Sequence, residues 1–188
     1  MPAKRTTQHT KSSAARNGKS RAVKKTGSAK PRTRASANGA DVLTLLHQDH
    51  QTVGDLIDEV QDCEPGDRRL QELGRSIAAA LTVHAKIEED FFYPELRDRS
   101  GEGEPLTDVF EAYTEHDVIK HLVALVKSDR ARDERFKAEL QVLGEEVKHH
   151  VKEEESTIFK LARKLLSRDE LESLGASMSK EKERLQRA

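Results

Sequence analysis

A repeat of 66 residues constrains this chain more than any other feature of its sequence. Two apolar stripes, with the steps of three and four residues that are typical of a helix face, coincide when one is shifted by that offset. A fixed offset that matches apolar and polar positions alike indicates a duplicated helical hairpin. The paired positions are Leu43 and Val109, Leu46 and Ala112, His50 and His116, Val53 and Ile119, Ile57 and Val123, Val60 and Val126, His84 and His150, and Glu88 and Glu154.

The repeat predicts an all-α fold, an up-down-up-down four-helix bundle made of two such hairpins. Breaks at Glu64-Pro65-Gly66, at residues 97–105 and at residues 128–132 separate the four helical segments. Pro94 limits how far the second helix can continue. Ser167 and Glu170 have the spacing of a capping box, so we expect an extra C-terminal helix over about residues 169–185.

The first 40 residues have a different composition from the rest of the chain. They hold eleven Lys and Arg and no Asp or Glu, whereas the remaining residues carry a net charge of -12. Met1 and Val23 are their only large aliphatic side chains, too little apolar area to offset the entropy of ordering. We therefore predict a disordered basic tail, 1–40, joined to a bundle domain, 41–188. Such a tail suits non-specific contacts with DNA phosphates, and the alternative is a solubilising tail without a defined partner.

Other features bear on the compartment and exclude some chemistries. No apolar run is long enough to span a membrane, and no apolar segment follows the N-terminal charges as in a secretory signal. The single cysteine, Cys63, cannot form an internal disulfide, which favours a reduced, cytoplasmic location. The chain has neither a Gly-rich phosphate loop nor a Cys pair, which argues against nucleotide binding and zinc-finger chemistry.

Each of the four predicted bundle helices carries a histidine on its apolar stripe, and two of them add a glutamate four residues later. Positions i and i+4 share one helix face, so these side chains point together into the core. A lone histidine there is usually a hydrogen-bonded core residue, but buried carboxylates without a partner are costly. The pattern indicates a metal site, which Fe, Mn or Zn would suit. The candidate ligands are His50, His84, Glu88, His116, His150 and Glu154.

Several stretches resemble the hemerythrin-like domains, also called HHE cation-binding domains. They are Leu46–His50, His84–Glu89, Tyr93-Pro94, Glu115-His116 and His149–Glu155, and the resemblance covers about residues 41–166. It implies a four-helix bundle around a non-haem di-iron centre, that is, two Fe ions. It also implies that the four histidines are terminal ligands and that Glu88 and Glu154 bridge the metals.

One position departs from the pattern of the oxygen-carrying members. Where they have a second histidine one turn after the third-helix ligand, this chain has Lys120, which leaves each metal one open position. Tyr113, one turn before His116, and its repeat equivalent His47 are candidates for an additional ligand or for residues that support a ligand from outside. Glu89 and Glu155 lie about 100° off the ligand face, where we expect them to face solvent or orient a ligand histidine.

From the candidate site we expect a di-iron protein that binds, senses or reacts with O2, NO or peroxide. Open positions suit redox chemistry, so a peroxide- or NO-directed oxidoreductase is among the activities considered, and reversible O2 carriage is the least favoured. The alternative is a DNA-associated protein tethered by its basic tail, with a structural metal. The sequence decides neither the physiological ligand, nor turnover, nor the oligomeric state.

Overall fold

The structure is a computed structural model that describes residues 40–128 and 133–188. The described residues all belong to one compact unit, residues 35–188. The predicted basic tail, apart from Ala40, therefore lies outside the described residues. Within them the fold is all-α, as predicted, and no strand is present.

Four long helices form the bundle, and two of them continue through a short π-helix. The bundle helices are α1 (Val42–Gln61), α2 (Arg69–Ile87), α4 (Glu104–Ser128) and α5 (Glu134–Glu153). The helix α2 runs through η1 (Glu88–Phe92) into α3 (Tyr93–Ser100), and α5 runs through η2 (Glu154–Ile158) into α6 (Phe159–Leu165). The extra helix, α7 (Arg168–Gln186), completes the described chain.

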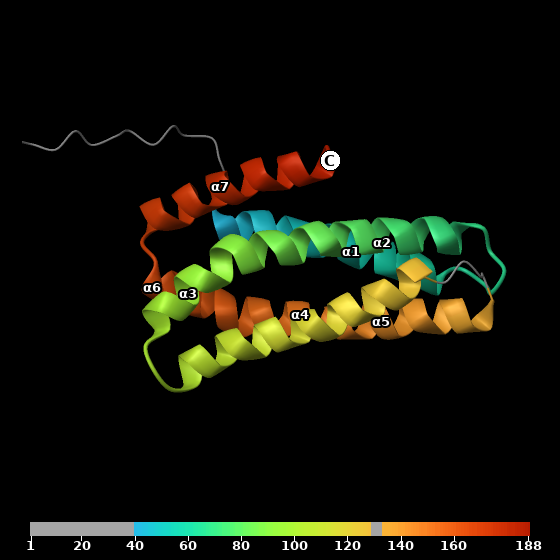
Figure 1. Ribbon diagram of the computed structural model, residues 1–188, viewed down its shortest axis with the longest axis horizontal. Coiled ribbons are helices and arrows are strands. Elements are labelled where there is room, and N and C mark those ends of the chain that lie inside the picture. Colours follow the sequence, from blue (N-terminus) through green and yellow to red (C-terminus); the bar gives the residue numbers. More distant parts are fainter. Residues whose placement is uncertain (1–39, 129–132) are drawn as a thin grey trace, which may run out of the picture. The chain divides into compact units, whose positions relative to one another are not determined.

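The two predicted hairpins lie against each other as a four-helix bundle (Figure 1). Within the first hairpin α1 packs on α2, within the second α4 packs on α5, and the hairpins meet through α1 with α5 and α2 with α4. The last helix, α7, lies along the first hairpin and contacts α1, α2 and η1. The predicted architecture, including the C-terminal helix, is confirmed.

Helix boundaries follow from local chemistry. The Asp41 carboxylate accepts a hydrogen bond from the Thr44 backbone N–H at 2.9 Å and begins α1. Ser167 and Glu170 form the predicted capping box at the start of α7. The chain stays helical through Pro94, which lies in the first turn of α3 directly after η1, and the helix continues to Ser100.

A polar layer divides the hydrophobic core into two clusters. On α1, Leu43 and Leu46 belong to one cluster, while Val53 and Ile57 belong to the other. The same division recurs on the other bundle helices, with the candidate ligands at the boundary. None of the helices described here is long and apolar enough to cross a membrane.

The C-terminal helix packs unusually closely on the start of the bundle. A Cβ placed on Gly175 of α7 would lie 2.6 Å from the Ala40 carbonyl oxygen and 2.7 Å from the Val42 amide nitrogen. Leu171 and Met178, one turn to either side, are buried in the core cluster that contains Val42. Glycine is therefore required at position 175 for α7 to reach this position.

Candidate metal centre

The six predicted ligands converge in the polar layer, and all are buried. Their exposed fractions run from 0 to 6%. In order along the chain they are His50, His84, Glu88, His116, His150 and Glu154. The fold thus brings together every residue that the repeat singled out, from all four bundle helices.

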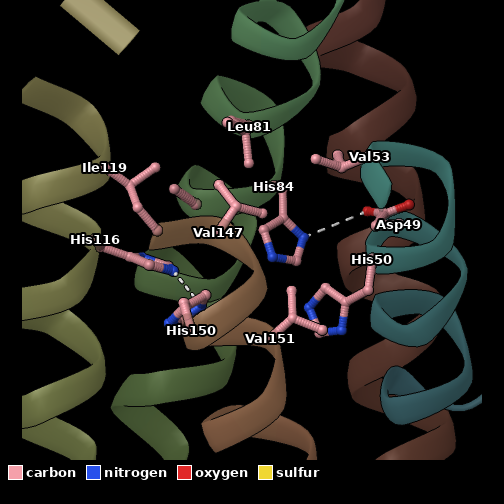
Figure 2. A pocket seen from close by; sticks show the side chains of 11 residues that line it. Asp49, His50, Val53, Leu81, His84, His116, Ile119, Val147, His150 and Val151 are labelled. Carbon is pink, nitrogen blue, oxygen red and sulfur yellow. Dashed lines mark hydrogen bonds and ion pairs between the residues drawn. The ribbon is translucent and has the colours of Figure 1, made fainter. Parts of the chain in front are cut away.

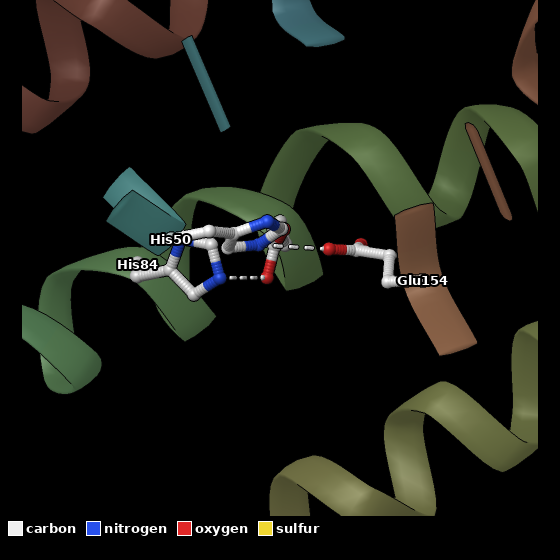
Figure 3. A group of neighbouring side chains, drawn as sticks. His50, His84 and Glu154 are labelled. Atoms are coloured by element: carbon white, nitrogen blue, oxygen red, sulfur yellow. Dashed lines mark ion pairs between the residues drawn. The ribbon is translucent and has the colours of Figure 1, made fainter. Parts of the chain in front are cut away.

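The donor atoms of these residues fall into two groups that share one carboxylate. His50, His84, Glu88 and Glu154 form one group, and Glu88, His116 and His150 form the other, with the donor atoms of each group within 4.8 Å of one another. Figure 3 shows His50 and His84 next to each other with the Glu154 carboxylate facing them. Glu88 belongs to both groups, whereas Glu154 belongs to the first group alone.

The distances between donor atoms fit metal coordination. Glu88 Oε2 lies 3.1 Å from His84 Nε2 and 3.2 Å from His116 Nε2. His50 Nε2 is 3.1 Å from Glu154 Oε2. Two donors bound at about 2.1 Å to one metal, and about 90° apart, lie about 3 Å from each other. The site has the spacing of neighbouring ligands before any ion is added.

Unsatisfied polar atoms concentrate at the same place. Among the described residues, buried side-chain atoms without a hydrogen-bond partner include His50 Nε2, His84 Nδ1, Glu154 Oε2 and both carboxylate oxygens of Glu88. Such atoms are costly in a protein interior unless a cation or a proton occupies the space between them. His116 Nε2 and His150 Nε2 also face each other at 3.1 Å. The residues present therefore fit a bound metal.

The two π-helices begin at the two buried glutamates. The Tyr93 N–H bonds to the Glu88 carbonyl, and the Phe159 N–H bonds to the Glu154 carbonyl, five residues earlier in each case. This wider turn places position i+5 closer to the face of position i than an α-helix does. As a result, the side chain of Tyr93 points into the same layer as Glu88, and that of Phe159 stacks on the His50 ring with centroids 5.9 Å apart.

Three of the candidate ligand histidines are held from outside by carboxylates, and two of these contacts are related by the sequence repeat. His50 Nδ1 lies 2.8 Å from Glu155, and the equivalent His116 Nδ1 lies 2.8 Å from Glu89. His150 Nδ1 lies 2.8 Å from Glu115. Because ionised carboxylates only accept hydrogen bonds, Nδ1 carries the proton and Nε2 is directed at the centre. Of the two roles considered for Glu89 and Glu155, orienting a ligand histidine is the one that the contacts favour.

The fourth histidine breaks this symmetry. The repeat equivalent of Glu115 is Asp49, which is one methylene shorter, and its Oδ2 lies 3.7 Å from His84 Nδ1. Asp49 instead forms an ion pair with Lys182 of α7. Burial raises the pKa of Asp49, but the contacts with His84 and Lys182 outweigh burial and hold its pKa below the ordinary value.

The electrostatics of the metal-free centre are uneven between its two carboxylates. Burial, with the nearby charge of Glu154, raises the pKa of Glu88 well above its ordinary value. Burial also opposes the charge of Glu154, but its hydrogen bond with His50 prevails and lowers the Glu154 pKa. Burial disfavours the protonated form of His50, but its contact with Glu154 outweighs burial and raises the pKa of His50 to about 9. For His84 burial prevails and lowers the pKa to about 4.

Tyr93 lies in a stretch that carries the family resemblance, but no role in the centre was predicted for it from the sequence. Its fully buried hydroxyl donates a hydrogen bond to Glu154 Oε1 at 3.1 Å and lies 3.3 Å from His116 Nε2. In an uninterrupted α-helix the position five residues after Glu88 would point away from the face of Glu88, and no residue pattern here predicts a π-helix. No role was predicted from the sequence for Asp49 and Glu115 either. Each directly precedes a candidate ligand histidine, and the 66-residue offset that relates them was an available signal.

The two additional candidates lie outside the donor groups. The Tyr113 ring packs edge-on against the Tyr93 ring with centroids 5.1 Å apart. His47 Nδ1 lies 2.8 Å from Glu155, the carboxylate that also holds His50. Lys120, which stands where a further histidine ligand is found in oxygen carriers, instead points outward and pairs with Glu89 at 2.9 Å.

A small cavity adjoins the four histidines. Its volume is about 10 Å³. Figure 2 shows His50, His84, His116 and His150 around it, with apolar side chains on the other side. The apolar lining consists of three repeat-related pairs, Val53 with Ile119, Leu81 with Val147, and Ala85 with Val151. A space of this size holds roughly one water molecule.

Fold and site together define a class of protein, the four-helix bundles with a metal centre of carboxylates and histidines in the core. Comparison with known families gives the particular one. Residues 41–162 match the hemerythrin HHE cation binding domain, and the chain belongs to this family. It is therefore a metal-ion-binding protein, as predicted.

Two known proteins are similar to this chain. A protein named DNA nickase from Nostoc sp. is 31% identical over 146 residues, which cover 78% of this chain and 40% of that relative. The chain thus spans less than half the length of the relative. A hemerythrin HHE cation binding domain-containing protein from Mycobacterium kansasii has a crystal structure that matches with a TM-score of 0.67 at 18% identity, covering 78% of this chain and 87% of that one. The second comparison supports the fold.

Proposed function

We propose that this chain holds a di-iron centre with the six buried ligands and that the centre binds and reacts with a small molecule, namely O2, NO or peroxide. Iron, when bound, supplies redox chemistry with such molecules. The protein supplies the ligands, fixes three of the histidines through the outer carboxylates, and keeps bulk water out. Peroxide- or NO-directed oxidoreductase activity is the form of reactivity that we favour.

The observation that supports this proposal best is the size and lining of the cavity beside the histidines. A space of about 10 Å³ leaves no room for a metabolite-sized substrate, so only a very small molecule could reach the histidines there. Its valine, leucine and isoleucine wall offers no hydrogen bond to a larger polar ligand. The buried hydroxyl of Tyr93 lies at the centre and donates a hydrogen bond to Glu154. The outward position of Lys120 leaves the inner space to a small molecule.

The test is to purify the protein from iron-replete cells and to measure metal content and the near-ultraviolet spectrum together. We expect about two iron ions per chain and an absorption band of an oxo-bridged ferric pair. Both should be lost in Glu88→Ala, because Glu88 belongs to both donor groups. Addition of peroxide or NO to the reduced protein should then change the spectrum.

His84→Ala and His121→Ala form a matched pair for this test. His84 lies in the centre, while His121 is an exposed histidine on α4. The first substitution should remove metal and reactivity, and the second should change neither. Zinc as the single bound metal, or a reduced protein that forms a stable reversible O2 adduct, would contradict the redox proposal.

A second function is favoured by a separate observation, the charge of the first 40 residues. We infer that this segment, with a net charge of +11, binds DNA without sequence preference. The name of the Nostoc relative, DNA nickase, agrees with DNA association. Because the match covers 40% of that relative, the nicking activity itself is not assigned to this chain.

Fluorescence anisotropy with a short labelled duplex tests this inference. Affinity should fall by orders of magnitude between about 50 and 200 mM salt, as expected when many phosphate contacts release counterions. A chain that begins at residue 41 should not bind, whereas His84→Ala should bind as the parent does. Binding that does not depend on salt, or that survives removal of residues 1–40, would refute the role of the tail.

A further inference from the structure

A groove on the outside of the first hairpin leads toward the metal centre. It has a volume of about 610 Å³ and is bordered by α1, α2 and α7. Its lining includes Thr52 and Leu56 of α1, Ala80 of α2, and Lys182 and Leu185 of α7. The groove is therefore open to solvent on one side and closed by bundle helices on the other.

Two residues line both this groove and the small cavity beside the histidines. They are Asp49 and Val53, one turn apart on α1. Asp49 is 8% exposed, and in Figure 2 its carboxylate lies beside the cavity and faces His84. Asp49 thus stands between the outer space and the inner one, with one oxygen toward His84 Nδ1 and the other paired with Lys182.

The repeat shows that this arrangement is specific to one side of the molecule. At the equivalent place in the second hairpin, Glu115 reaches His150 Nδ1 at 2.8 Å and is its hydrogen-bond partner. Asp49 is too short to do so and leaves His84 Nδ1 without a hydrogen-bond partner. The cation that holds Asp49 comes from α7, the helix that has no counterpart in the repeat. Asp49, which is shorter than its equivalent Glu115, and the additional helix α7 therefore meet at the boundary between the groove and the cavity.

We propose that the groove is the route by which small molecules reach the metal centre, and that the Asp49–Lys182 ion pair is its gate. The inference rests on the proposed function, because it concerns the ligand of the same centre. When Lys182 moves with the C-terminal end of α7, Asp49 is released and the passage beside Val53 opens. Asp49 and Lys182 control access and have no part in the reaction.

A second hollow approaches the centre from the opposite hairpin and is a poorer route for anions. Its volume is about 80 Å³, and it reaches the buried ligand Glu154. Five carboxylates line it: Asp108, Glu111, Glu115, Glu153 and Glu154. This concentration of negative charge repels an anionic probe such as azide, whereas the groove balances one acid with Lys182.

Stopped-flow mixing of the oxidised, metal-loaded protein with azide tests the gate. Lys182→Met should raise the association and dissociation rate constants together, by about tenfold, and leave the equilibrium affinity unchanged, because a gate alters the barrier and not the end states. Lys180→Met makes the same change of charge and shape two residues away on α7 and should leave both rate constants as in the parent.

A bulky side chain in the groove tests the route. Thr52→Trp should slow azide association by about tenfold or more. Its control is Val118→Trp, since Val118 is the repeat equivalent of Thr52 and is 45% exposed on α4. A third variant, Thr157→Trp, obstructs the acidic hollow instead. Circular dichroism and metal content should show that all variants are folded and loaded.

The outcomes separate this inference from the proposed function. If the parent protein forms no azide adduct, the proposed reactivity fails together with the gate. If the adduct forms but Lys182→Met leaves both rate constants unchanged, the gate is refuted. Slowing by Thr157→Trp rather than Thr52→Trp would assign access to the acidic hollow and overturn the route proposed here.

Discussion

At the residue scale, the centre depends on carboxylates that belong to neither donor group. Glu115 holds His150, and Glu89 and Glu155 hold His116 and His50, each at 2.8 Å from Nδ1. Such partners fix the ring and raise the basicity of the nitrogen that faces the metal. They lie one residue away from the ligand face, so their importance follows from geometry that hydrophobic periodicity does not encode.

Glu115→Gln should therefore weaken metal binding although Glu115 is not a proposed ligand. We expect a loss of about 10- to 100-fold in affinity, the usual effect of removing a carboxylate that orients a ligand histidine. Competition with a chelator of known affinity measures it. Glu111→Gln, one turn earlier on the same helix and exposed, is the control, and an equal loss in both variants would show a general effect of surface charge.

The raised pKa of His50 makes metal binding depend on pH. In the metal-free fold the pKa is about 9, above the ordinary 6.5, so the protonated ring stabilises that fold fully below pH 6.5 and less as pH rises through 9. Metal binding needs the Nε2 lone pair and must release this proton. Metal addition at about pH 7.5 should release protons into weak buffer, and affinity should fall as pH is lowered. Proton release that is as large at about pH 10 would refute the assignment to His50.

The sequence could predict the converging residues of the centre but not every contact around them. The repeat predicted all six residues that converge, because a shared offset and a shared helix face are properties of the sequence. It could not predict Tyr93, whose position depends on the π-helix η1, nor the contact of Asp49 with Lys182, which joins residues 133 positions apart.

At the scale of elements, the packing of α7 can be tested through glycine. Gly175→Ala should lower the free energy of unfolding by about 1–3 kcal/mol, because the added methyl group meets backbone atoms of Ala40 and Val42 that cannot rotate away. Gly54→Ala in α1 meets nothing within 4 Å and should instead stabilise by about 0.5–1 kcal/mol through helix propensity. Urea denaturation of both variants measures the difference. Stabilisation by Gly175→Ala would show that α7 does not lie closely on α1.

The number and order of the elements were predictable, while their internal irregularities were not. The Ser167 and Glu170 capping box marks the start of α7 in the sequence as clearly as in the structure. The two π-helices carry no such signal, since their five-residue turns are stabilised by the packing of Tyr93 and Phe159 in the core.

At the scale of the whole molecule, the metal and the fold support each other. Removing the metal leaves carboxylates and imidazoles buried between two hydrophobic clusters, which is unfavourable. Chelation should therefore lower the free energy of unfolding, by about 4 kcal/mol for a metal held at a thousand times its dissociation constant. Thermal unfolding with and without chelator measures this. An unchanged midpoint would mean that the centre contributes nothing to the fold.

The cytoplasmic location and the disorder of residues 1–40 stay predictions.

Each hairpin supplies three of the six converging residues: His50, His84 and Glu88 from the first, and His116, His150 and Glu154 from the second. A single hairpin is thus half of a site, and an ancestor consisting of one hairpin could form the centre only by pairing with a copy of itself. Because both halves are parts of one chain, they need not be identical. Tyr93 opposite Phe159, and Asp49 opposite Glu115, are places where the halves have since diverged. The sequence repeat accounts for the six converging residues, and the positions that depart from the repeat make the two sides of the centre different.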